Sequence, residues 1–123
     1  MIRVVCGVIY KRDKFLITRR KPGIALEGKW EFPGGKIKDS ETGLEALKRE
    51  LLEELGMQVE VLGKIGSNIH HYPNFSIELI AYKCTFIEAS FKLTDHDAYE
   101  WISKVDISNF DLADADKPFI DLI

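Results

Sequence analysis

Apolar residues follow a helical spacing most clearly between residues 42 and 55. Leucines recur there at every third or fourth position, which predicts an amphipathic helix over Thr42–Leu55. The apolar stripe consists of Leu44, Leu47, Leu51 and Leu55. Thr42 with Glu45 three residues later fits a capping box, and Gly56 is a natural C-terminal stop. The pattern therefore predicts one helix with defined ends.

Short runs rich in Val, Ile and aromatic residues predict strands on either side of this helix. These runs are Arg3–Tyr10, Phe15–Arg19, Gln58–Ile65, Ile77–Phe86 and Ala98–Ile102, with a short extended piece at Trp30–Phe32. Polar or glycine-rich connections at 11–14, 21–29 and 70–74 predict turns and loops, and Pro118 opens a short terminal helix over Pro118–Leu122. The order of elements predicts a single α/β domain over residues 1–123, with helices covering a sheet.

Composition narrows the class of protein. The chain has 123 residues, 30% of them charged, with a net charge of −3 and a pI of about 5.6. These values argue against a nucleic-acid partner. No apolar run approaches the ~18 residues of a membrane span, and no cleavable leader is visible. Cys6 and Cys84 lack partners at metal or redox spacing, so we expect two buried thiols and a cytoplasmic protein.

The predicted helix carries more acidic residues than its packing needs. Glu50, Glu53 and Glu54 span an arc of about 100°, whose centre lies roughly 110° from the leucine stripe. Carboxylates so close repel one another unless a cation lies among them, and an all-oxygen set suits Mg²⁺ or Mn²⁺. The alternative is a solvated acidic face, balanced by Lys48 and Arg49.

The surrounding sequence favours the metal site. Gly35, Glu41, Arg49-Glu50-Leu51, Glu53-Glu54 and Gly56-Met57 match every fixed position of the Nudix box. The chain resembles the Nudix hydrolases, and its flanking segments resemble the MutT-type subfamily of nucleoside triphosphate pyrophosphohydrolases. The resemblance implies an α/β/α sandwich with a mixed β-sheet between helices, and a Mg²⁺ cofactor for which Mn²⁺ can substitute.

The resemblance also implies roles for single residues. The implied metal ligands are the Gly34 carbonyl, Glu50, Glu53, Glu54 and Asp95. The implied catalytic residues are Glu50, Glu53 and Arg49, with the choice of general base left open. The implied substrate-side residues are Arg20, Phe32, Gly35, Glu41, Tyr72 and Asp116, of which Glu41 supports the metal cluster. Some of these residues have structural alternatives: a surface charge for Arg20, core or rim aromatics for Phe32 and Tyr72, and a turn residue for Asp95. His70, His71 and His96 are interpreted as polar loop residues.

Asp116 departs from one branch of the subfamily. The 8-oxoguanine-specific relatives carry an asparagine there, whereas an ionised Asp only accepts hydrogen bonds. An acceptor suits cytosine N4 or the N1/N2 edge of guanine. A helix cap is the structural alternative for this residue.

The expected activity is Mg²⁺-dependent hydrolysis of a nucleoside triphosphate to monophosphate and pyrophosphate. The expected role is removal of oxidised or non-standard nucleotides such as 8-oxo-dGTP. The nearest alternative is a CTP or modified-dCTP pyrophosphohydrolase. Alternatives of other classes are a non-catalytic nucleotide sensor, which would be expected to lack box carboxylates, and an enzyme acting on capped or triphosphorylated RNA. We expect a monomer or weak dimer.

Overall fold

A mixed seven-stranded sheet forms the framework of the protein, whose computed structural model describes residues 1–123. The strands are β1 (Ile2–Lys11), β2 (Lys14–Arg20), β3 (Trp30–Glu31), β4 (Gly34–Lys36), β5 (Met57–Tyr72), β6 (Phe75–Ala89) and β7 (His96–Ile102). The main order is β3-β2-β1-β6-β5, while β4 pairs with β1 and β7 pairs with β2. β1 and β6 run parallel, and all other pairs are antiparallel.

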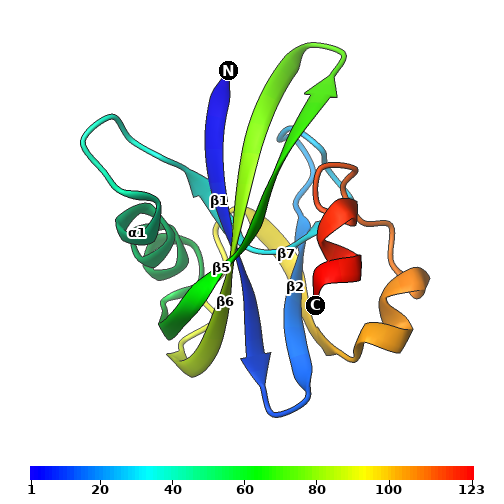
Figure 1. Cartoon of the computed structure of the whole chain (residues 1–123). Helices are drawn as coiled ribbons and strands as arrows, with labels where there is room; N and C mark the ends of the chain where they lie inside the picture. The colour runs from blue at the N-terminus through cyan, green and yellow to red at the C-terminus, as the bar shows by residue number, and fades with distance from the viewer.

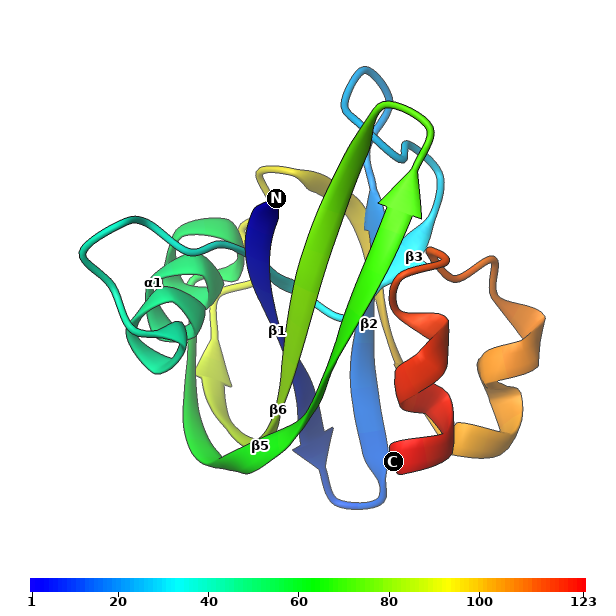
Figure 2. The ribbon, with the colours of Figure 1, turned by 45° about the horizontal axis from the view of Figure 1, so that its top comes forward.

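Helices cover both faces of the sheet (Figures 1 and 2). The α-helix α1 (Gly43–Leu55) lies on one face, and the 3₁₀ helices η1 (Lys104–Asn109) and η2 (Lys117–Leu122) lie on the other. Alternate residues of β1 serve the two layers, because successive strand side chains point to opposite faces. Val5 and Ile9 pack in the α1 layer, whereas Val8 packs in the η layer. The predicted sandwich with a mixed sheet between helices is confirmed.

The caps of α1 are those that the sequence predicts. The Thr42 hydroxyl accepts from the Glu45 N–H (3.1 Å), and the Glu45 carboxylate accepts from the Thr42 N–H (2.9 Å). Gly56 ends the helix in the left-handed region at φ 58°. The predicted stripe is wrong at Leu44, which is 40% exposed. Ala46 is buried in the first turn instead, so the buried face is displaced from the one that the leucines define.

The β5–β6 hairpin is longer than its apolar runs. β5 continues to Tyr72 and β6 begins at Phe75, so the connection is only Pro73 and Asn74. The prediction of a loop over residues 70–74 is wrong for the first three of them. The sequence pattern missed this extension because the end of β5 is only half-buried and carries polar residues, while backbone pairing with β6 maintains the strand.

The start of β7, the helix η1 and the strand β4 differ from the predictions. His96 is a buried residue at the start of β7 and not a loop residue, because its ring bonds a carboxylate inside the protein. η1 was not predicted, whereas the predicted terminal helix is present as the 3₁₀ helix η2. β4 was not predicted because glycine disfavours strands. A Cβ on Gly34 would collide with the Val5 carbonyl, so glycine is what lets β4 approach β1.

No helix is long and apolar enough to cross a bilayer.

Two adjacent leucines of α1 test which face supports the core. Leu51 is 1% exposed and Leu52 is 56% exposed. We expect Leu51→Ala to lower the free energy of unfolding by about 2–5 kcal/mol, because it leaves a cavity under the helix. Leu52→Ala, the matched control, should change it by less than about 0.5 kcal/mol. Urea unfolding followed by circular dichroism measures both, and equal losses would contradict the assigned orientation of α1.

Candidate active site

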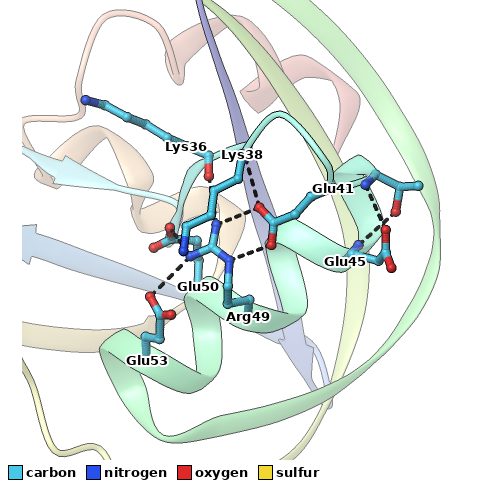
Figure 3. Close-up of polar contacts among 8 residues, drawn as sticks. Lys36, Lys38, Glu41, Glu45, Arg49, Glu50 and Glu53 are labelled. Atoms are coloured by element: carbon cyan, nitrogen blue, oxygen red, sulfur yellow. Dashed lines mark hydrogen bonds and ion pairs between the residues drawn. The ribbon is translucent and has the colours of Figure 1, made fainter.

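Arg49 is the centre of a polar network on the exposed side of α1 (Figure 3). Its guanidinium donates to both carboxylate oxygens of Glu41, to Glu50 at 2.8 Å and to Glu53 at 3.2 Å. It also donates to the Lys36 carbonyl at 3.0 Å. One cation therefore ties α1 to the loop that precedes it and to the end of β4. Such bidentate, charge-assisted contacts fix geometry as well as adding stability.

Glu41 is held as an anion by this network. The hydrogen bond from Arg49, helped by the Lys38 N–H (2.9 Å), lowers the pKa of Glu41 to about 2. In turn, the hydrogen bond to Glu41 raises the pKa of Arg49. Glu41 therefore acts here through Arg49, which holds two of the box glutamates.

Glu54 lies in an environment unlike that of Glu41, because it has carboxyl neighbours and no cationic partner. It is 8% exposed and lies beside the carboxyls of Glu50 and Asp95. Burial, reinforced by these two neighbours, raises the pKa of Glu54 far above its ordinary value. No lysine or arginine forms an ion pair with Glu54 or Asp95. Three carboxyls thus approach one another with no cation on the Glu54 side, and the electrostatic cost of this arrangement favours a bound cation.

The other two predicted metal ligands are placed differently. Glu53 lies on the solvent side of α1, where its side chain is 56% exposed and bonds Arg49. The Gly34 backbone lies in β4, paired with Cys6 of β1. The side chains do not converge into a preassembled set of three metal ligands. Glu54 thus lies beside Glu50 and beside Asp95, whereas the Glu53 side chain points to solvent.

Gly35 connects the carboxylates with a cavity. A Cβ at this position would overlap the Glu50 carboxyl group, so the absence of a side chain is what lets Glu50 lie against the β4 backbone. Gly35 also lines a cavity of about 360 Å³. This volume lies within the range of ~300–1,000 Å³ that is typical of small-molecule sites. A ligand in the cavity would therefore extend directly toward the acidic cluster.

The cavity gathers most of the predicted substrate-side residues. Its lining includes Arg20, Phe32, Gly34, Gly35, Tyr72 and Asp116. The sequence analysis missed other parts of the lining, notably Phe75, whose ring lies 5.0 Å from that of Tyr72. Both rings come from the end of the long hairpin, so the strand extension that was missed is also what builds this wall. Nothing in the local sequence distinguishes Phe75 from a core aromatic.

Asp116 lies inside the cavity and does not cap η2, because its side chain makes no cap hydrogen bond there. Its carboxylate oxygen accepts from the Phe32 N–H at 2.9 Å. Burial and the nearby Glu31 raise the pKa of Asp116 well above its ordinary value, which favours the protonated acid. A protonated carboxyl can donate as well as accept. In the structure Asp116 accepts a hydrogen bond, as an acceptor at this position is expected to do, and its contact with a base stays a prediction.

A second buried network lies at the same wall. His96 Nε2 lies 2.9 Å from a Glu31 carboxylate oxygen, and the Arg20 guanidinium approaches the same oxygen at 3.5 Å. Arg20 also donates to the Ala25 carbonyl at 2.9 Å. Arg20 is therefore held at the cavity and is not a free surface charge. Only the three-dimensional pairing of β2 with β3 and β7 links these residues, so sequence spacing did not reveal the network.

Comparison with known proteins identifies the family. The model of the NUDIX domain matches residues 4–122. A CTP pyrophosphohydrolase of Escherichia coli (strain K12) is 32% identical over 98% of this chain and 90% of its own length. A putative 8-oxo-dGTP diphosphatase 2 of Mycobacterium tuberculosis is 34% identical over 95% and 84%. The chain belongs to the Nudix family. The crystal structure of a MutT protein from Methanosarcina mazei Go1 superposes with a TM-score of 0.88 at 27% identity, covering 98% of this chain and 90% of that one.

The predicted family, its MutT type and the hydrolase class are thereby confirmed. Nudix hydrolases generally require a divalent metal, usually Mg²⁺. The donor set here fits such an ion, because it consists of oxygen atoms and includes carboxyls without a cationic partner. Hard, oxygen-preferring cations are favoured over Zn²⁺ at a site without cysteine or histidine ligands.

The Arg49–Glu41 pair of this Nudix hydrolase predicts a specific loss of stability in acid. The pKa of Glu41 is about 2 in the folded protein against an ordinary 4.5, so its contribution is present above pH 4.5 and is lost as the pH falls toward 2. We expect the difference in unfolding free energy between the wild type and Glu41→Gln to shrink from pH 6 to pH 3. Urea midpoints at both pH values measure it, with exposed Glu60→Gln as control. A difference that stays constant would contradict the assignment.

Proposed function

We propose that this Nudix hydrolase converts nucleoside triphosphates and water to nucleoside monophosphates and pyrophosphate. The observation that carries the proposal is the continuity at Gly35 between a cavity with aromatic walls and a cluster of carboxyls. A flat base fits between aromatic side chains, and a polyphosphate requires a cation-binding end. The relatives named for CTP and for 8-oxo-dGTP support the same class of substrate.

Mg²⁺ would be held by Glu50, Glu53, Glu54, Asp95 and the Gly34 carbonyl. When bound, the ion supplies neutralisation of phosphate charge and alignment of water with the scissile bond. Glu54 and Asp95 supply the buried side of this set, where no protein cation competes. Glu53 supplies the solvent side, from which its exposed side chain can turn inward.

Arg49 and the two glutamates that it bonds, Glu50 and Glu53, perform the proton transfer and its orientation. Glu50 or Glu53 accepts the proton from the attacking water, as a general base. Arg49 orients both carboxylates and is itself oriented by Glu41 and by the Lys36 carbonyl. At the other end, Arg20 offers a positive charge to the nucleotide, while Phe32, Tyr72 and Asp116 contact the base.

The physiological role that we propose is removal of oxidised or non-standard nucleotides such as 8-oxo-dGTP from the nucleotide pool. A second candidate substrate is CTP or a modified dCTP, favoured by the carboxyl at position 116 in the base cavity. A hydrogen-bond acceptor at Asp116 suits cytosine N4 or the N1/N2 edge of guanine, so this residue is compatible with either base. A purely nucleotide-binding sensor is less consistent with a chain that retains every box carboxylate.

The box glutamates provide the first test. We expect Glu53→Gln and Glu54→Gln each to lower kcat on the order of 10²-fold or more, because each loses a charged oxygen ligand or base. Glu45→Gln is the matched control, since it lies on the same helix, loses the same charge and keeps a capping-box residue at N3. Steady-state kinetics with Mg²⁺ measure all three. Wild-type turnover in Glu53→Gln and Glu54→Gln would refute the site.

A nucleotide panel tests the substrate class. Wild-type protein with Mg²⁺ is incubated with the four common ribo- and deoxyribonucleoside triphosphates, 8-oxo-dGTP and a triphosphorylated RNA. Monophosphate and pyrophosphate are quantified separately from orthophosphate, with EDTA as the metal-free control. We expect monophosphate and pyrophosphate in equal amounts, and none with EDTA. An absence of products with every nucleotide would support the sensor class. A preference for the triphosphorylated RNA would overturn the proposed substrate.

A further inference from the structure

The segment Leu112–Asp116 lies between β3 and β5, and its last two residues, Ala115 and Asp116, line the cavity. On the β3 side, the Ala113 N–H donates to the Trp30 carbonyl at 2.8 Å. The Phe32 N–H donates to the Asp116 carboxylate at 2.9 Å. These bonds hold the beginning of the segment and the tip of the Asp116 side chain. Within the segment, the Asp116 N–H donates to the Ala113 carbonyl at 3.0 Å, and further bonds to this backbone come from the side of β5.

Two side chains of β5 hold that backbone. The Ala115 N–H donates to the Tyr72 hydroxyl at 3.0 Å, and Asn68 Nδ2 donates to the Ala115 carbonyl at 3.2 Å. Asn68 and Tyr72 are four residues apart on a regular part of the strand, so both point to the same face of the sheet. The Ala115 carbonyl belongs to the peptide bond that leads into Asp116. Both peptide groups that flank Ala115 therefore form a hydrogen bond with a side chain of β5.

We infer that Asn68 and Tyr72 are positioning residues that orient Asp116 and thereby set the base preference of this hydrolase. The inference rests on the proposed function, in which Asp116 contacts the base. Tyr72 acts in two ways, because its ring lines the cavity while its hydroxyl bonds Ala115. Asn68 does not line the cavity and acts only through the backbone.

The hydrogen bonds from Asn68 and Tyr72 to the Ala115 backbone matter for base specificity for the following reason. A site that distinguishes bases by hydrogen bonds depends on where its donor and acceptor lie, and a small displacement leaves buried polar groups unpaired. Asp116 has a single hydrogen bond at its carboxyl, from Phe32. Its direction relative to a base therefore depends on the backbone that carries it. The two β5 side chains restrict that backbone on the side opposite β3.

The test compares Tyr72→Phe and Asn68→Ala with two matched controls. Tyr10→Phe removes a tyrosine hydroxyl on β1, and Ser67→Ala removes a polar group on the other face of β5; neither residue lines the cavity. Calorimetry measures the Kd of each protein for CMP, GMP and 8-oxo-dGMP, and kinetics give KM and kcat for the matching triphosphates. Amide exchange at Ala115 reports on the backbone independently of activity.

We expect the ratio of Kd values between the best and the worst base to fall about three- to tenfold in both variants, as loss of one hydrogen bond allows. KM should rise more than kcat falls, and the Ala115 amide should exchange faster in Tyr72→Phe. Both controls should behave as the wild type. Because Asn68 does not line the cavity, Asn68→Ala keeps the test informative should Tyr72→Phe fold poorly.

Two outcomes would overturn the inference while leaving the proposed function standing. One is an unchanged ratio of Kd values in both variants. The other is an equal weakening for every base, which a merely structural role would produce. A wild-type protein that binds none of the nucleotides would instead overturn the proposed function, and the inference with it.

Discussion

The repulsion among carboxyl groups on one helix is the constraint on which the site depends. Glu50, Glu53 and Glu54 lie within one turn of α1, and Asp95 approaches Glu54 from the loop before β7. Arg49 balances this charge on the solvent side and holds Glu41 together with two of the three glutamates. The buried side has no such partner, and there the pKa of Glu54 rises. The protein thus leaves an unbalanced acidic position where a cation can be bound.

This end of the site could be predicted from the sequence because its parts are close along the chain. The glycines of β4, Glu41 and the box glutamates fall within about two dozen residues. Helical periodicity predicted all three carboxylates on one face away from the leucines, but Glu54 is buried while Glu53 is exposed. The caps of α1 could be predicted for the same reason. Even so, the stripe that included Leu44 misjudged the buried face, because leucine spacing alone does not reveal that Ala46 and Glu54 are also buried there.

The other end could not be predicted in the same detail because its contacts join distant segments. His96 bonds Glu31 across 65 residues, and Phe32 bonds Asp116 across 84. The sequence identified Phe32, Tyr72 and Asp116 by resemblance alone and missed Phe75, Asn68 and the Glu31–His96 pair. Polar residues near the end of β5 indicated a loop, whereas the strand is maintained by backbone pairing with β6 along its whole length. Burial of a single histidine or aspartate leaves no periodic pattern to detect.

The two ends are therefore built by different physical means, which in the proposed function separates catalysis from base recognition. Three of the carboxylates lie on one helix, where Arg49 bonds two of them, whereas the cavity wall is assembled from several strands and the segment before η2. Gly35 is the point of contact, because a Cβ there would displace Glu50. Among the partners that hold Arg49, only Lys36 also lines the cavity. Substitutions at Phe32, Tyr72 or Asp116 therefore remove none of the hydrogen bonds of Arg49. One hydrolytic centre can in this way serve cavities that differ in their preferred base.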